Sequence, residues 1–197
     1  MQLDREYWQQ RYAEENTPWD ASRITTPIKA YVDQLTDTNL RILLPGAGNA
    51  HEAEYLHARG FTQVYVCDWV EAPLKQLQAK IPHFPPAHLL HGDFFELPYA
   101  GFFDLIIEQT FFCALPPSMR SRYATQCAHL LAKGGKLVGL FFNFPLDPSS
   151  EAAPPYGGTE EEYRSYLLPH FTNVHFAPCY NSIKPRAGKE LWGVGSR

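Results

Sequence analysis

The chain has 197 residues, of which 45% are hydrophobic and 19% are charged. This length suits one domain, and the apolar content is sufficient for a buried core, which excludes a chain that is disordered throughout. With 17 Lys and Arg against 21 Asp and Glu, the formal net charge is -4, which argues against a protein that coats DNA or RNA.

The chain shows no targeting or metal-binding signal. No run approaches the roughly 18 consecutive apolar residues that a membrane span needs, and the polar start at Met1–Trp8 is unlike a signal peptide. The four cysteines, Cys67, Cys113, Cys127 and Cys179, lack zinc-type spacing. We therefore expect a soluble, cytoplasmic protein with reduced thiols, no metal, no membrane or nucleic-acid partner and a small-molecule substrate. No heptad run suggests a coiled-coil dimer, so we expect a monomer.

Two helices are predicted before residue 39. The first runs from Leu3 to about Glu15 and is amphipathic, with aromatic residues at Tyr7, Trp8 and Tyr12. A polar turn at residues 16–20 follows, and Pro27 is well placed to start a second helix that ends at Leu35.

From residue 40, short apolar runs alternate with helical segments. We expect strands at 40–45, 64–68, 87–91, 102–108 and 136–142, with helices at 51–59, at 70–80 and from Pro116 to Leu131, the last capped by Gly134 and Gly135. Continuous apolar strands that alternate with helices are typical of a parallel sheet covered on both faces.

The last part of the chain has a different pattern. A Pro- and Gly-rich loop at Pro145–Gly158 precedes a helix at Glu160–Leu168 and two strands, Asn173–Tyr180 and Lys189–Val194, which can pair antiparallel. The sequence thus predicts an α/β, Rossmann-like fold with a mostly parallel seven-stranded sheet. We expect a single domain over residues 1–197, with an N-terminal helical cover at 1–38 and the core at 39–197.

A glycine turn follows the first predicted strand. Gly46 and Gly48 flank Ala47, and such a turn lets the backbone approach a ligand closely at the carboxyl end of a parallel strand. Asp68 ends the second strand 20 residues after Gly48, where a carboxylate accepts hydrogen bonds from the ribose hydroxyls of an adenosine cofactor. Together these residues predict an adenosine site.

The details of the turn favour S-adenosylmethionine. A pyrophosphate requires a third glycine at the place that His51 occupies, which counts against NAD or FAD, and no P-loop lysine follows. S-Adenosylmethionine has no phosphate. His51 itself is interpreted as a solvent-facing residue at a helix N-terminus. After the third strand, Asp93 is placed to reach the adenine or, alternatively, to cap a turn.

Several motifs resemble the thiopurine S-methyltransferase family, and especially its halide and thiol methyltransferase branch. The similarity extends over nearly the whole chain. The motifs are Tyr7-Trp8-x-x-x-Tyr12 with Trp19-Asp20, Pro45-Gly-Ala-Gly48, Asp68, Gly92-Asp-Phe-Phe95, Thr110-Phe-Phe-Cys-Ala-Leu-Pro-Pro117 with Arg120 and Tyr123, and Pro185-Arg186-x-Gly-Lys-Glu190.

The resemblance implies a class I methyltransferase that uses S-adenosylmethionine and releases S-adenosylhomocysteine, with the helical cover closing over cofactor and substrate. The cofactor residues that it implies are Trp8, Tyr12 and Trp19 along the cofactor, Gly46 at the methionine end, Asp68 at the ribose, Asp93 and Phe94 at the adenine, and in addition Ala47, Gly48, Trp69 and Glu108. The family often has Asp-Arg or Asp-Tyr at the end of the fourth strand. Here Glu108-Gln109 stands there, and the missing arginine weakens a thiopurine assignment.

Methyl transfer from a sulfonium needs alignment of the nucleophile and exclusion of water more than it needs a strong base. We expect Trp19 and Glu108 to be the catalytic residues, with Glu108 taking a thiol proton or, alternatively, only making structural hydrogen bonds. The expected substrate-binding residues are Trp19, Gln109, Phe111, Phe112, Tyr156 and Arg186. Core packing for the phenylalanines and a solvated surface position for Arg186 are the alternatives. Cys113 is expected to pack, and Pro154–Gly157 to form a lid.

The sequence therefore favours a methyltransferase that acts on a small soft nucleophile: a thiol, or else a halide, selenium or tellurium species. A catalytically silent protein that binds an adenosine ligand is one alternative. A nicotinamide-dependent oxidoreductase is the other.

Overall fold

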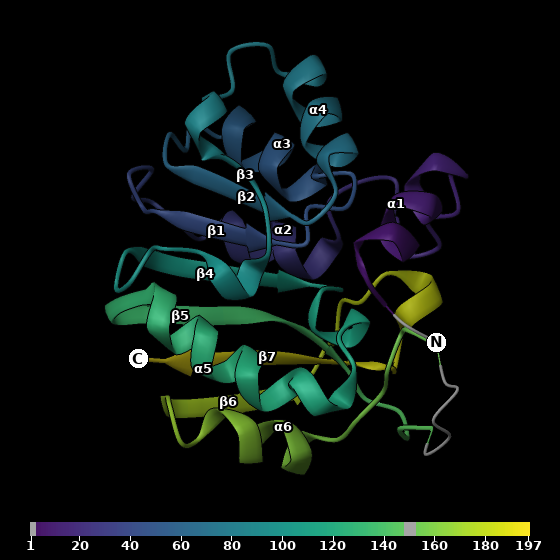
Figure 1. Cartoon of the computed structure of the whole chain (residues 1–197). Helices are drawn as coiled ribbons and strands as arrows, with labels where there is room; N and C mark the ends of the chain where they lie inside the picture. The colour runs from purple at the N-terminus through teal and green to yellow at the C-terminus, as the bar shows by residue number, and fades with distance from the viewer. Residues whose placement is uncertain (1–2, 148–152) are drawn as a thin grey trace. The chain divides into compact units, whose positions relative to one another are not determined.

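A computed structural model describes residues 3–147 and 153–197 of the chain (Figure 1). The backbone divides into two compact units, Gln2–Leu97 and Pro98–Arg197, called here the N-terminal and C-terminal units. This division falls well beyond the residue 38/39 boundary that the sequence suggests between cover and core.

The N-terminal unit is built on a three-stranded parallel sheet. β2 lies in the middle, with β1 in register from Ile42 opposite Val64 to Pro45 opposite Cys67, and with β3 on its other side. α3 and α4 pack against β2. The elements are α1 (Arg5–Ala13), α2 (Thr26–Val32), β1 (Ile42–Pro45), α3 (His51–Ala58), β2 (Val64–Asp68), α4 (Glu71–Lys80), η1 (Pro86–His88), β3 (Leu89–His91) and η2 (Phe94–Glu96).

Burial explains why these strands form from continuous apolar runs. Every residue of β1 and of β2 is buried, as expected for parallel strands covered on both faces. α1 is buried only in part: Tyr7, Trp8, Arg11 and Tyr12 are half-buried on one side, and no residue of the helix is fully buried. This helix therefore depends on aromatic contacts at one face rather than on insertion into a core.

The described residues of the C-terminal unit form four strands in the order β4-β5-β7-β6. β4 and β5 are parallel, whereas β7 is antiparallel to both β5 and β6, which confirms the predicted antiparallel pair near the chain end. The elements are β4 (Phe103–Gln109), η3 (Phe112–Ala114), η4 (Pro117–Met119), α5 (Arg120–Leu130), β5 (Leu131–Phe142), α6 (Glu160–Leu167), β6 (Thr172–Pro178), η5 (Lys184–Arg186) and β7 (Glu190–Ser196).

Across the whole chain the strand order is β3-β2-β1-β4-β5-β7-β6, in a mostly parallel, seven-stranded, Rossmann-like arrangement, so the predicted fold class is confirmed. In the part of the chain that the structure describes, no helix is long and apolar enough to cross a membrane. In the same residues, no group of three or more His, Cys, Asp or Glu side chains is placed to hold a metal ion.

One predicted feature near the end of α5 is wrong. Gly134 and Gly135 do not cap the helix, which ends at Leu130, but lie within β5. The pairing with β4 shifts between Phe103 opposite Leu131 and Leu105 opposite Lys136, and Gly134 has a φ of 80°. The two glycines therefore form an irregularity in a strand, where a positive φ suits glycine.

Candidate active site

The turn after β1 is fixed to the end of β2. The backbone N–H groups of Gly46 and Ala47 both donate to the carbonyl oxygen of Cys67, at 2.8 and 3.2 Å. Gly46 and Gly48 have φ values of 65° and 51°, a conformation that glycine adopts at little cost. The residues predicted to approach a cofactor thus form a defined turn at the strand end.

Asp68, the last residue of β2, lies beside this turn with 7% of its surface exposed. Its Oδ1 accepts a hydrogen bond from the Val70 N–H at 2.8 Å. Burial raises the pKa of the carboxyl to about 6, opposed by hydrogen bonds from the amides of Val70, Ala47 and Gly48 and from the Tyr12 hydroxyl. Asp68 is therefore a buried acceptor that connects the glycine turn to α1.

The end of β3 lies next to Asp68. Asp68 is opposite His91 in the sheet, and the Gly92 N–H donates to the Asp68 carbonyl oxygen at 3.0 Å. The Asp93 side chain accepts from the Phe95 N–H at 2.9 Å, which is the turn-capping arrangement that the sequence left open. The strand-end residues named by the sequence are thus together, while adenine contacts of Asp93 and buried Phe94 stay predictions, as does a cofactor contact of half-buried Trp69.

Three aromatic residues of the N-terminal unit gather at the same turn. The Trp19 ring meets Trp8 and Tyr12 edge to face, with centroids 5.6 and 5.7 Å apart. A Cβ added to Gly48 would lie 3.7 Å from the Trp19 Nε1. Burial, together with Asp68, raises the pKa of the Tyr12 hydroxyl above its usual range, so Tyr12 is a hydrogen-bond donor at physiological pH.

These residues fit S-adenosylmethionine. Asp68 offers a buried carboxylate that can accept from two ribose hydroxyls, and the glycine turn offers backbone without side chains at the same strand end. The aromatic faces of Trp8 and Trp19 can stabilise a sulfonium cation. The turn lacks the third glycine that a pyrophosphate requires.

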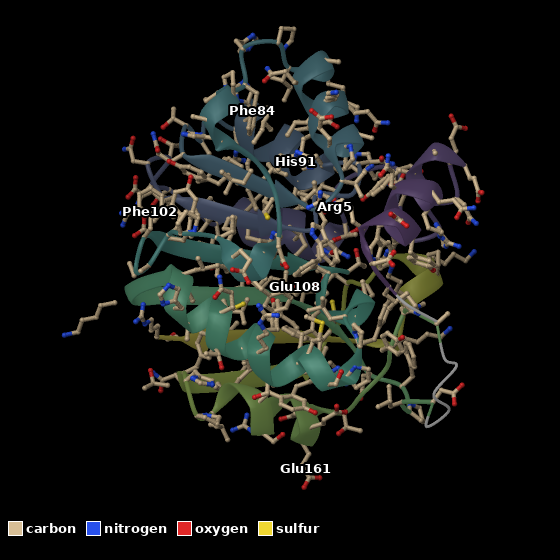
Figure 2. All side chains as sticks on the ribbon, viewed as in Figure 1. Arg5, Phe84, His91, Phe102, Glu108 and Glu161 are labelled. Atoms are coloured by element: carbon tan, nitrogen blue, oxygen red, sulfur yellow. The ribbon has the colours of Figure 1, made fainter. Side chains whose placement is uncertain are left out.

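In the C-terminal unit, Glu108 is fully buried near the end of β4 (Figure 2). Its Oε1 accepts from the N–H groups of Phe111 and Phe112, both at 2.8 Å, and its Oε2 accepts from the Tyr123 hydroxyl at 2.7 Å. Burial raises the pKa of the carboxyl to about 7, opposed by these three donors. Gly139 lies opposite Glu108 in β5, and its lack of a side chain leaves room for the Glu108 side chain, since a Cβ at Gly139 would lie 2.5 Å from the Glu108 Cβ.

The two phenylalanines after β4 differ in their surroundings. Phe112 is 4% exposed and packs on the rings of Tyr123, Phe141 and Tyr163, with centroids 5.1 to 5.4 Å away. Phe111 is half-buried, as is Gln109 at the end of β4. Phe112 therefore has the contacts of a core residue, the alternative that the sequence left open, whereas Phe111 and Gln109 are better exposed for contact with a substrate.

Tyr156 and Gly157 of the predicted lid, and Gly158 directly after it, are held by hydrogen bonds. The Tyr156 N–H donates to the Cys113 carbonyl oxygen at 2.7 Å, and the Gly158 N–H to that of Phe144 at 2.8 Å. Between them, the Gly157 carbonyl oxygen accepts from Arg120 Nη2 at 2.7 Å. Residues 148–152 of the predicted Pro- and Gly-rich loop lie outside the described residues.

Arg120 is a charged residue whose burial the sequence did not indicate. It is fully buried, its Nη1 lies 2.6 Å from Glu162 Oε1, and its guanidinium lies 5.0 Å from the centre of the Phe112 ring. A buried arginine requires such partners. Only its place after Pro116-Pro117 in the family motif marked it in the sequence.

Arg186 is also more buried than a solvated surface arginine, so that alternative is wrong. Its side chain is 11% exposed, lies 3.6 Å from buried Glu190 and faces the Phe142 ring at 5.9 Å. Burial raises the pKa of Glu190, against the effect of a hydrogen bond from Ser182 and of Arg186. Burial likewise raises the pKa of the Cys113 thiol, against the effect of Arg186, so Cys113 is a buried neutral thiol.

The interpretation of His51 as a solvent-facing residue is wrong. Its side chain is 20% exposed, and its Nε2 lies 2.8 Å from Asp20 Oδ1. The two residues are 31 positions apart, so no local pattern could indicate this contact.

Comparison with known proteins leads to one family. The family model described as thiopurine S-methyltransferase (TPMT) matches residues 3–196. The chain is 32% identical to the probable thiol methyltransferase 2 of Arabidopsis thaliana and 30% identical to thiocyanate methyltransferase 1 of the same plant. In both cases the match covers 94% of this chain and 82% of the relative. The solved 1,6-didemethyltoxoflavin-N1-methyltransferase of Burkholderia thailandensis, with bound 1,6-didemethyltoxoflavin and S-adenosylhomocysteine, is similar with a TM-score of 0.73 at 20% identity, covering 99% of this chain and 87% of that chain.

The strand order together with the family match defines a methyltransferase that uses S-adenosylmethionine. Within this class, the chain belongs to the thiopurine S-methyltransferase family. The predicted family, enzyme class and cofactor are thereby confirmed.

Proposed function

We propose that this chain transfers the methyl group of S-adenosylmethionine to a small, soft nucleophile, most directly a thiol. The observation that carries the proposal is the buried Asp68 beside the glycine turn and Trp19, in a chain whose relatives are named as thiol and thiocyanate methyltransferases. The bound cofactor supplies an electrophilic methyl carbon on a sulfonium.

On the cofactor side, each residue has a role that suits its surroundings. Asp68 would accept from the ribose hydroxyls, and the backbone at Gly46, Ala47 and Gly48 would lie along the methionine part. Trp8, Tyr12 and Trp19 would cover the cofactor and exclude water, with Trp19 facing the sulfonium. The remaining proposed contacts are those of Trp69, Asp93 and Phe94.

On the acceptor side, we propose Gln109, Phe111, Tyr156 and Arg186 as the residues that contact the substrate, with Phe112 behind them in the core. Arg186 is a mostly buried cation, so it favours an acceptor that binds as an anion, such as a thiolate or thiocyanate. Gln109 stands where the family often has an arginine, which favours a small acceptor over a thiopurine.

We propose that Glu108 mainly positions the loop that bears Phe111 and Phe112. Its two carboxylate oxygens already accept from two amides and from Tyr123. The role of proton acceptor for a neutral thiol stays a prediction. A Glu108→Gln variant would separate these roles, because loss of a base lowers kcat most above about pH 7, where wild-type Glu108 is ionised, and below the pKa of the thiol acceptor, where the acceptor still carries its proton.

The first test is calorimetric titration of the purified chain with S-adenosylhomocysteine, with NADH as the matched control. We expect micromolar binding of the first and no binding of the second. Binding of NADH alone would favour the oxidoreductase alternative and would overturn the proposal.

The acceptor is tested next with S-adenosylmethionine and a panel of a small thiol, thiocyanate, iodide and a thiopurine. We expect turnover of the thiol and thiocyanate at higher kcat/KM than of the thiopurine. Tight binding of S-adenosylhomocysteine with no turnover of any acceptor would favour a silent adenosine-binding protein.

We further propose that the chain acts in the cytoplasm, as a monomer and without nucleic acid. The reduced cysteines Cys67, Cys113 and Cys127, all buried, support a reducing compartment. Light scattering after size-exclusion chromatography would test the monomer.

A further inference from the structure

Asp20 connects the residue after Trp19 to the residues after the glycine turn. Its Oδ2 accepts from Asn49 Nδ2 at 2.5 Å, and its Oδ1 lies 2.8 Å from His51 Nε2. Both contacts cross about 30 residues of sequence. We call Asp20, Asn49 and His51 the Asp20 cluster.

The Asp20 carboxylate is well supplied with donors. The Ser22 N–H also donates to Oδ1, at 2.8 Å. Burial alone would raise the pKa of Asp20, but the hydrogen bonds from Ser22, His51 and Asn49 outweigh it and hold the pKa below its usual value. Asp20 is therefore ionised at neutral pH, and its hydrogen bonds are of the stronger, charge-assisted kind.

The cluster lies where it can determine the position of Trp19. Trp19 immediately precedes Asp20, and its indole Nε1 lies beside Gly48, which immediately precedes Asn49. Trp19 also meets the rings of Trp8 and Tyr12 edge to face, and the Arg11 guanidinium lies 5.6 Å from the centre of the Trp19 ring. These contacts are weaker and less directional than an ionic hydrogen bond. The segment that bears Trp19 lies between α1 and α2 and is neither helix nor strand.

Further charges surround His51. Its Nδ1 lies 3.8 Å from Glu54 Oε1, and Glu54 Oε1 lies 2.5 Å from Lys80 Nζ. Lys80 also donates to the Asn49 carbonyl oxygen at 3.4 Å. The α3 side of the cluster is thus itself fixed by α4.

We propose that Asp20, Asn49 and His51 are positioning residues that hold Trp19 against the glycine turn and so slow the release of S-adenosylmethionine and S-adenosylhomocysteine. The proposal rests on the proposed roles of Asp68 and the turn in cofactor binding. His51 stands where dinucleotide-binding turns have their third glycine. In this chain, we infer, its side chain helps to fix the position of Trp19.

The experiment compares S-adenosylhomocysteine affinity and dissociation rate for the full chain and for Asp20→Ala, His51→Ala and His51→Gln. The glutamine amide can still donate to Asp20. We expect the two alanine variants to bind about tenfold more weakly, through faster dissociation, as expected for loss of a charge-assisted hydrogen bond. His51→Gln should stay within about twofold of the wild type, since one donor is kept.

Steady-state kinetics separates positioning from a general structural role. KM for S-adenosylmethionine should rise about tenfold in the alanine variants while kcat at saturation stays within about twofold. Asp33→Asn is the matched control. Asp33 also makes two ion pairs in the N-terminal unit, with Lys29 at 2.6 Å and with Arg59 at 3.0 Å, and has no described contact with the turn. It should leave both constants unchanged.

Asp68→Ala distinguishes the possible failures. If Asp68→Ala weakens binding but Asp20→Ala and His51→Ala bind like the wild type, the Asp20 cluster has no positioning role and the proposed cofactor site stands. If Asp68→Ala also binds like the wild type, the proposed cofactor site itself is wrong. Equal weakening by His51→Gln and His51→Ala would overturn the role of the hydrogen bond.

Discussion

Asp68 in the N-terminal unit and Glu108 in the C-terminal unit are both carboxylates at the end of a parallel strand, and burial raises the pKa of both. Their donors differ. Among the described residues, Glu108 accepts from two amides of its own loop and from the hydroxyl of Tyr123, which is fully buried. Asp68 has Tyr12 among its donors, and Tyr12 comes from α1, a helix with no buried residue.

The difference shows that an acid at a strand end does not by itself define a ligand site. A donor on a helix with no fully buried residue has little packing to lose when a ligand hydroxyl replaces it. A donor in a packed core cannot be exchanged without loss of the packing. By this criterion we expect Asp68 to be a binding residue and Glu108 to be mainly a structural one.

The largest expected effect is on folding, from Glu108→Ala. The change leaves two amides and the Tyr123 hydroxyl without their acceptor in a buried place, and it leaves a cavity. We expect the free energy of unfolding to fall by about 3–5 kcal/mol, measured by urea denaturation. Glu161 is the control, because it is exposed on α6 and points away from the ribbon in Figure 2. Glu161→Ala should change the free energy of unfolding by less than about 0.5 kcal/mol. A loss under about 1 kcal/mol for Glu108→Ala would contradict the structural role.

Next in size is a pH dependence of stability. Below pH 4.5, Glu108 is neutral in both folded and unfolded chains; between 4.5 and about 7 the unfolded chain loses a proton that the folded chain keeps. The contribution of Glu108 to stability therefore falls as pH rises through this window, by about 3 kcal/mol, and is constant above it.

Glu108→Gln removes this titration and keeps the size of the side chain. Urea denaturation of both proteins from pH 4.5 to 8 should show the wild type losing stability relative to the variant as pH rises. A difference that does not depend on pH would mean that Glu108 has an ordinary pKa in the folded chain.

The third expected effect is on cofactor binding. Asp68→Ala removes the acceptor for the ribose hydroxyls and should reduce S-adenosylhomocysteine affinity by about 1.5–3 kcal/mol, measured by calorimetry. The free energy of unfolding without ligand serves as the control that the variant still folds. An unchanged affinity would refute the proposed role of Asp68 at the ribose, and Asp68 could then no longer be contrasted with Glu108 as a binding residue.

The sequence predicts best where one physical signal dominates a short stretch. Continuous apolar runs located β1 and β2, and the glycines with Asp68 located the turn, because strand ends in a parallel sheet meet at one edge. The antiparallel pair at the end of the chain follows from two adjacent strand patterns.

Contacts between side chains that are far apart in the sequence could not be predicted from such local signals. Asp20 and His51 are 31 residues apart, and Arg120 and Glu162 are 42 apart. A charged residue at the start of a helix is ordinarily exposed, so nothing local indicated that Arg120 is buried. Gly134 and Gly135 followed a helix, where a cap is the common role, and only the pairing of β5 with β4 shows them to be within a strand.

The smallest expected effect tests the exchangeable donor directly, by making the same change in both units. Tyr123→Phe removes the hydroxyl from Glu108 Oε2, which stays buried, so the free energy of unfolding should fall by about 1–3 kcal/mol. Tyr12→Phe removes the hydroxyl from Asp68, but α1 can shift and admit water, so the loss should be below about 1 kcal/mol. Urea denaturation of the two variants under one buffer measures both. Equal losses would mean that Tyr12 is as fixed as Tyr123, and the distinction between a binding carboxylate and a structural one would then have to rest on ligand affinity alone.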